Sequence, residues 1–185
     1  LDNTYDKAEF LEFDQRLRKI FEVDALAYVV EPKIDGVAVS LTYTRGELER
    51  AVTRGNGVEG DVVTQNLLQV KKLPRQLMGD NIPDTIEIRG EIYMTHEEFL
   101  RINEERESAG EPLYANPRNL AAGTVKLLDP KEARQRKLDI VLYGLGGCDQ
   151  SNLFTRQSGF HQAIIAWKLP TVEKSWTVPS VNEAW

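Results

Sequence analysis

A lysine between two carboxylates is the first feature of the sequence that could carry chemistry. Glu31, Lys33 and Asp35 alternate with other residues in the run Glu31–Gly36, and residues two apart in a strand share a face. A free lysine amine has a pKa of about 10.4, so a nucleophilic lysine here needs desolvation or nearby cations to lose its proton. The flanking carboxylates favour the ammonium instead. The same three residues also fit a solvated ion-pair cluster on the surface.

Glycines cluster behind a second cation, Arg54. Gly55, Gly57 and Gly60 follow it, and glycine permits positive φ and close approach of the backbone to a ligand. The guanidinium supplies a fixed fork of donors for a phosphate or a sugar. The spacing matches neither a P-loop nor a dinucleotide fingerprint, and a glycine-rich turn after a strand explains the run equally well.

A third candidate is a charged strand. Alternation places Glu87, Arg89 and Glu91 on one face of the segment Glu87–Met94. A carboxylate there could bind a metal or a ribose hydroxyl. The alternative interpretation is the solvated outer face of an amphipathic strand.

The fourth candidate is Tyr114–Lys126, which is poor in bulky apolar residues. Asn116 and Pro117 are typical of a helix N-terminus. Arg118 and Lys126 bracket a run of small residues, and such a segment can lay backbone and cations against an anionic ligand.

Composition narrows the classes of protein that the chain can represent. It has 185 residues, of which 41% are hydrophobic and 28% charged, with a net charge of −6. These values are ordinary for a globular protein and argue against disordered or fibrous classes, while the acidic balance argues against a dedicated DNA-binding module. The single cysteine, Cys148, cannot form an internal disulfide or a zinc site. No apolar stretch is long enough for a membrane span and no secretory leader opens the chain, so we expect a cytoplasmic protein.

The elements that must position these residues are predicted from periodicity. Asp35-Gly36 is expected to form a hairpin turn, so that three antiparallel strands follow one another, whereas the last fifteen residues show no clear element. The mixture of helices and hairpins predicts an α+β fold, with antiparallel sheets and packed helices. We expect helices at 6–22, near 61, at 95–108 and at 154–167, and strands at 28–33, 37–44, 48–53, 85–94 and 138–145.

Taken together, these segments resemble the covalent nucleotidyltransferases. Glu31–Gly36 is similar to the lysine-bearing first motif of DNA ligases, RNA ligases and capping enzymes. Thr53–Asn66 and Ala115–Lys126 are similar to the NAD-dependent DNA ligases of bacteria, and Leu1–Tyr5 resembles the start of their adenylation domain. The resemblance implies a nucleotidyltransferase (ATP-grasp-like) adenylation domain that is incomplete at the C-terminus. Within residues 1–185 it would comprise a leading helix (1–22), a motif-bearing core (23–147), and a C-terminal helix with an extended segment (148–185).

The same resemblance implies a role for each matching residue. Lys33 would attack the α-phosphorus of NAD and form lysyl-AMP, AMP would pass to the 5′-phosphate at a nick in duplex DNA, and the 3′-hydroxyl would displace it. Glu31 would help to hold the adenine, and Asp35 would support the lysine and the bound nucleotide. Arg54 and Glu91 would contact the ribose, with Glu91 also near a Mg²⁺ ion that neutralises phosphate charge.

Three more residues receive roles from the resemblance. Tyr143 would stack on the adenine, and Arg118 and Lys126 would lie by the transferring phosphate or the nicked DNA. The chain departs from the family at Lys126, where arginine is usual and where lysine lacks the bidentate fork. It also departs at Asn56, where aspartate is common, and at residues 60–64, where the family has Gly-Glu-Asp-Val-Thr.

Several parts of the family are absent from these residues. No Asp-Gly pair recurs after Gly36, so the fourth motif is missing, and so are a later lysine motif, the upstream domain that binds nicotinamide mononucleotide, and the OB-fold, zinc-finger, helix-hairpin-helix and BRCT regions. We therefore expect this chain by itself to react poorly with NAD. We also expect a monomer without membrane association.

Two rival functions remain at this point. An ATP-dependent polynucleotide ligase would share the lysine motif, and a non-catalytic nucleotide-binding or scaffold domain could keep the motifs by descent. The plainest alternative is an α+β domain whose charged strands are merely solvated.

Overall fold

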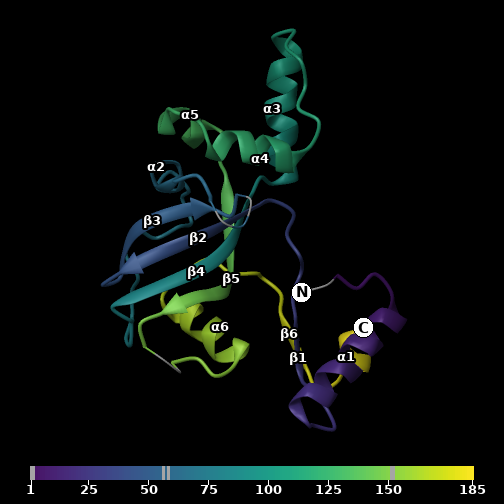
Figure 1. Ribbon diagram of the computed structural model, residues 1–185. Coiled ribbons are helices and arrows are strands. Elements are labelled where there is room, and N and C mark those ends of the chain that lie inside the picture. The colour runs from purple at the N-terminus through teal and green to yellow at the C-terminus, as the bar shows by residue number, and fades with distance from the viewer. Residues whose placement is uncertain (1–2, 56, 58, 151–152) are drawn as a thin grey trace. The chain divides into compact units, whose positions relative to one another are not determined.

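The computed structural model describes residues 3–55, 57, 59–150 and 153–185. They fall into two compact units. The smaller unit combines the chain up to Lys33 with Val172–Trp185, and the larger unit spans Ile34–Thr171. Each unit has its own sheet, and Figure 1 labels the elements of both.

The smaller unit contains α1 (Lys7–Phe21), β1 (Tyr28–Val30), β6 (Trp176–Val178) and α7 (Val181–Ala184). β1 and β6 pair as a two-stranded antiparallel sheet. The first helix begins after Asp6, whose side chain accepts a hydrogen bond from the backbone N–H of Glu9 at 2.9 Å. This is the usual way for an aspartate to cap a helix N-terminus.

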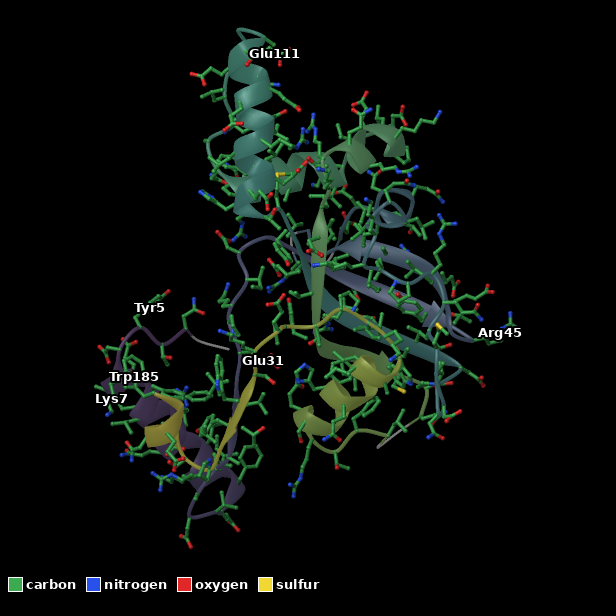
Figure 2. The ribbon with its side chains drawn as sticks, turned by 180° about the vertical axis from the view of Figure 1, so that it is seen from behind. Tyr5, Lys7, Glu31, Arg45, Glu111 and Trp185 are labelled. Carbon is green, nitrogen blue, oxygen red and sulfur yellow. The ribbon has the colours of Figure 1, made fainter. Side chains whose placement is uncertain are left out.

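A buried carboxylate and an aromatic cluster hold the smaller unit together. Asp14 is only 3% exposed and accepts hydrogen bonds from Arg18 Nε at 2.7 Å and from the Tyr28 hydroxyl at 2.8 Å. The ring of Phe10 packs against Tyr28 and Trp185, with centroids 5.5 and 6.4 Å apart. In Figure 2, Trp185 lies beside Lys7, the first residue of α1. The two chain segments of this unit are therefore joined by side chains as well as by strand pairing.

The larger unit is built on a four-stranded antiparallel sheet in the order β3-β2-β4-β5. Arg45 and Gly46 both have positive φ, 50° and 78°, which matches the tight turns that join antiparallel strands. Figure 2 shows Arg45 at this hairpin tip, far from Glu111 at the other extreme of the unit. The strands are β2 (Val37–Thr44), β3 (Glu47–Thr53), β4 (Thr85–Tyr93) and β5 (Asp139–Cys148).

Helices complete the core of the larger unit. Figure 1 shows α3, α4 and α5 gathered at one end of β5, with α6 at its other end. Side chains from both strands and helices are fully enclosed, among them Leu41, Ile88, Leu120, Leu142 and Phe160. The helices are α2 (Thr64–Leu67), α3 (His96–Ser108), α4 (Pro117–Val125), α5 (Pro130–Gln135) and α6 (Gln157–Ala166).

The predicted antiparallel α+β class is confirmed, but the prediction for the first strand is wrong. Only Tyr28–Val30 is a strand, and it pairs with β6 rather than with β2. Asp35-Gly36 is consequently not a hairpin turn, and the three-strand succession does not exist. Pro32 follows shortly after β1 and has no N–H to donate to a ladder.

Two further predictions need correction. The last fifteen residues are not without structure, since they hold β6 and α7. The helix expected near Asp61 begins only at Thr64, because Val62 forms an isolated bridge with Val52 instead. The other predicted elements agree with the structure to within a few residues. No helix in the described part of the chain is long and apolar enough to cross a membrane.

Candidate active site

The lysine motif lies where the chain leaves the smaller unit. Glu31 and Lys33 follow β1 in irregular backbone, the first half-buried and the second exposed. Figure 2 shows Glu31 on this extended stretch. Because the stretch is not a strand, the prediction that Glu31, Lys33 and Asp35 share a strand face is wrong.

The other half of the motif begins the larger unit. An added Cβ on Gly36 would lie 2.1 Å from the carbonyl oxygen of Ile92, so this position requires glycine to let the backbone pass against β4. Next to it, the Asp35 carboxylate accepts a hydrogen bond from Arg118 Nη1 at 2.7 Å. Both side chains are largely exposed. The structure thus brings together two predicted site residues that lie far apart in the sequence.

Arg118 is positioned by the start of α4. The Asn116 side chain accepts a hydrogen bond from the backbone N–H of Asn119 at 2.8 Å, and Pro117 occupies the first turn. Both features fix where the helix begins, as the sequence predicts. The backbone that carries Arg118 is therefore fixed in the first turn of α4, although the guanidinium itself is exposed.

Three residues predicted to bind the nucleotide come together on the exposed face of β4. The Tyr143 hydroxyl donates a hydrogen bond to Glu91 Oε2 at 3.3 Å. The pKa of Tyr143 is raised, mainly by burial and then by the charge of Glu91, while the charge of Arg54 opposes that shift. Arg54 is tied to the same place because its backbone N–H donates to the carbonyl of Ala38 at 2.9 Å, and Ala38 is the cross-strand partner of Glu91.

A bulge between β4 and β5 helps to aim Tyr143. Arg89 pairs with Gly144 whereas Gly90 pairs with Leu142, so Tyr143 is the extra residue. Bulges of this kind re-aim side chains and are common near active sites. Gly90 is required here, because an added Cβ would lie 2.4 Å from the carbonyl oxygen of Val141. As predicted from alternation, Glu91 lies on the less buried face of β4, together with Glu87 and Arg89.

The glycine-rich loop after Arg54 is closed on itself. An added Cβ on Gly60 would lie 1.7 Å from the carbonyl oxygen of Thr53, and one on Gly55 would lie 1.9 Å from that of Glu59. The close approach that these glycines permit is therefore to the loop's own backbone. Asn56, one of the departures from the family pattern, lies outside the described residues.

The far end of α4 carries Lys126, whose Nζ lies 2.7 Å from Asp61 Oδ2. This contact lowers the pKa of the Asp61 carboxyl. Asn66 provides a deeper anchor that the sequence analysis missed. It is 7% exposed, and its Nδ2 donates to the carbonyls of Val125 and Leu127, the neighbours of Lys126, at 2.7 and 2.8 Å. The sequence did contain one sign of this anchor. Asn66 precedes Leu67 and Leu68, and an asparagine buried beside leucines needs hydrogen-bond partners for its amide.

Metal ligands are sparse around these residues. The described part of the chain contains no group of three or more His, Cys, Asp or Glu side chains arranged to hold a metal ion. Glu91 is a single carboxylate on a solvent-facing strand surface. This fits Mg²⁺, which commonly takes one or two protein carboxylates and completes its shell with water and substrate phosphates.

Comparison with known proteins gives a consistent result. The chain is 57% identical to "DNA ligase 1" of Opitutus terrae over its whole length, which is 28% of that protein. It is 48% identical to the DNA ligase of Desulforudis audaxviator and 41% identical to that of Protochlamydia amoebophila, over 90% and 100% of the chain and 24% and 28% of those proteins. The chain thus spans about a quarter of the length of these relatives.

One protein family matches nearly the whole chain. The family model of the NAD-dependent DNA ligase adenylation domain matches residues 1–184. Together with the relatives, this confirms the resemblance to the bacterial NAD-dependent ligases predicted from the motifs. The chain belongs to the NAD-dependent DNA ligase adenylation domain family.

Proposed function

We propose that this adenylation domain uses Lys33 to take AMP from NAD for the sealing of nicks in duplex DNA. The observation that carries the proposal is the grouping of Arg54, Glu91 and Tyr143, three residues distant in sequence, at one bulged place on the sheet. Family membership supplies the reaction.

The covalent step conserves atoms and charge. The neutral Nζ of Lys33 attacks the α-phosphorus of NAD, a P–N bond forms, and the P–O bond to nicotinamide mononucleotide breaks. Nicotinamide mononucleotide leaves with the electron pair of that bond. The nitrogen, which is positively charged once the P–N bond has formed, then releases one proton to solvent. In the next step the phosphate of the DNA 5′ end displaces lysine, and the 3′-hydroxyl then displaces AMP.

The chain's own residues divide this work. Glu31 contacts the adenine, Arg54 and Glu91 hold the ribose, and the Tyr143 ring offers a stacking surface. Burial and the charge of Glu91 raise the pKa of Tyr143, and its protonated hydroxyl donates to Glu91. Bound Mg²⁺, held by Glu91 and the phosphates, would supply charge neutralisation.

Two cations at the ends of α4 face the phosphate chemistry. Arg118 lies at the N-terminal end and is paired with Asp35, while Lys126 lies at the C-terminal end and is paired with Asp61. Both pairs are exposed, so an anion can replace either carboxylate at small cost. We propose that these cations contact the transferring phosphate or the nicked DNA, in a monomer located in the bacterial cytoplasm.

The experiment is a chimeric ligase. This chain replaces the matching segment of the Opitutus terrae ligase, and nick sealing is measured with and without Lys33→Ala, with NAD or ATP as the only nucleotide. We expect NAD-dependent sealing and a lysyl-AMP mass gain, both abolished by the substitution, whereas Lys19→Ala on α1 leaves them unchanged. Sealing that survives Lys33→Ala, or a protein that ATP labels and NAD does not, would overturn the proposal.

The isolated chain gives a second measurement. We expect little mass gain when the chain alone is incubated with NAD and Mg²⁺, since it corresponds to only 28% of the Opitutus terrae relative. A mass gain of one AMP on most molecules within the time that the chimera needs would contradict this expectation.

A further inference from the structure

A small pocket in the larger unit is surrounded by positive charge. It has a volume of about 160 Å³. We call it the basic pocket and define it by Lys71, Lys72, Arg134, Lys137 and Asp139, which line it. Lys71 and Lys72 follow α2, and Arg134 lies in the last turn of α5. Lys137 lies two residues before β5, and Asp139 is the first residue of that strand.

Asp139, the carboxylate in the basic pocket, is hydrogen-bonded within the protein. Asp139 is 9% exposed and accepts hydrogen bonds from Lys72 Nζ at 2.5 Å, from the Tyr93 hydroxyl at 3.3 Å and from the backbone N–H of Ile140 at 2.9 Å. Its negative charge is therefore balanced by Lys72. It does not offset the positive charges of Lys71, Arg134 and Lys137.

The remaining cations are poorly neutralised. Lys137 Nζ lies 3.5 Å from a Glu98 carboxylate that Arg101 already holds through two hydrogen bonds. Neither Lys71 nor Arg134 forms an ion pair with any residue for which the structure gives a position. Gathering like charges in one place is unfavourable, and it is the more notable in a chain with a net charge of −6. An external anion would remove this penalty.

The size of the pocket limits the kind of anion. Sites for drug-sized ligands usually measure about 300 to 1,000 Å³, so 160 Å³ is too small for a nucleotide but adequate for one phosphate group. The pocket also lies near the residues proposed to face DNA, because α5 contacts both α2 and α4, and Lys126 directly follows α4. Phosphate contacts from lysine and arginine position a protein on nucleic acid without reading its sequence.

We propose that the basic pocket binds one backbone phosphate of duplex DNA, as a contact additional to those made by Arg118 and Lys126. This inference rests on the proposed function for its choice of ligand. A free phosphate or the phosphates of NAD share the same chemistry, so the experiment separates these sources.

The test uses the 185-residue chain and a fluorescently labelled nicked duplex, with binding measured by anisotropy at about 50 mM salt and upward. The double substitution Lys71→Glu/Arg134→Glu leaves Lys72 and Asp139 intact. We expect at least a tenfold loss of affinity and a salt slope smaller by about 1, the value for one lost phosphate contact. The control Arg50→Glu/Arg156→Glu changes the net charge equally at exposed positions outside the pocket, and we expect a loss below twofold.

Several outcomes would overturn the proposal. These are equal losses in the two double variants, no loss in the pocket variant, or no binding of the duplex by the unmodified chain. Calorimetry with NAD and with inorganic phosphate forms the second arm, and an affinity for either that exceeds the affinity for DNA and disappears in the pocket variant would also overturn it. The milder Lys71→Gln/Arg134→Gln variant, checked for an unchanged melting temperature, guards against misfolding.

The proposal and the proposed function can fail separately. DNA binding is measured without NAD and again on Lys33→Ala, so a failure of adenylation leaves the pocket result standing. Conversely, loss of the pocket contact leaves lysyl-AMP formation in the chimera unchanged.

Discussion

Each of the two units of this chain is stabilised internally by a different kind of interaction. The larger unit encloses apolar side chains from strands and helices alike, many of them with no exposed surface. The smaller unit instead relies on the buried Asp14, its partners Arg18 and Tyr28, and a group of aromatic rings. Lys33 belongs to the smaller unit, whereas Arg54, Glu91 and Tyr143 belong to the larger one. The proposed nucleophile and the proposed nucleotide contacts should therefore respond differently to mutation and to pH.

The strongest test of this contrast removes apolar packing from the larger unit. Leu41→Ala deletes a fully buried side chain of β2, and we expect a loss of about 3 kcal/mol in the free energy of unfolding. Fluorescence of Trp167, which is buried in this unit, follows its unfolding once Trp176 and Trp185 are replaced by Phe. A second version of the chain keeps Trp176 and Trp185, carries Trp167→Phe and reports on the smaller unit. An equal loss of stability in that unit on Leu41→Ala would break the contrast.

A buried polar anchor in the larger unit should rank next. Asn66→Ala removes two hydrogen bonds to the carbonyls beside Lys126, and we expect a loss of about 2 kcal/mol, measured by urea unfolding. Gln65→Ala, at an exposed position of the same helix, is the matched control and should change stability very little. A cost for Asn66→Ala no larger than the control's would show that apolar packing alone fixes this end of α4.

The smaller unit should be sensitive to alkaline pH. Burial and the hydrogen bond to Asp14 raise the pKa of Tyr28 to about 12, against about 10 in the unfolded chain. The folded state then holds the proton more tightly, so this stabilisation is complete below pH 10 and is lost as the pH rises through 12. Near-ultraviolet circular dichroism of the smaller unit should report the loss.

Tyr28→Phe supplies the control for that pH dependence. The variant should be less stable at neutral pH by about 1 kcal/mol, and its stability should fall less between pH 10 and 12. An unchanged alkaline profile would mean that Tyr28 titrates normally and that the polar network matters less than the aromatic cluster.

The smallest effect on stability is expected at the exposed pair of Arg118 and Asp35. Arg118→Ala removes the contact with Asp35, and because both side chains are largely exposed we expect less than about 0.5 kcal/mol in stability. Nick sealing by the chimera should nevertheless fall at least tenfold, since the pair is proposed to serve phosphate chemistry. Equal sealing by Arg118→Ala and by Arg156→Ala would remove Arg118 from the site.

Local patterns predicted most of the fold because they depend on nearby residues. The Asn116 cap, the alternation of β2 and β4 and the periodicity of α1 each depend on residues within a few positions of one another. The pairing of β1 with β6 joins segments about 150 residues apart, and no periodicity reports a partner at that distance. For the same reason the short β6 carried no signal of its own.

The candidate site divides in the same way. Residue types and spacing were enough to select Lys33, Arg54, Glu91 and Arg118, but the partners emerged only from the fold. Asn66 escaped notice because its value comes from two carbonyls about 60 residues later. The sequence left two explanations of the glycine loop open, because a glycine required by its own backbone has the same sequence signature as one required by a ligand.

The length of α4 has a consequence of its own. Arg118 and Lys126 stand eight positions apart, which is about 12 Å along a helix axis. Inserting or deleting one residue between them would move one end by about 1.5 Å and turn it by about 100°, so the contact with Asp35 and the contacts with Asn66 could not both survive. The segment therefore acts as a spacer of fixed length between these two sets of contacts.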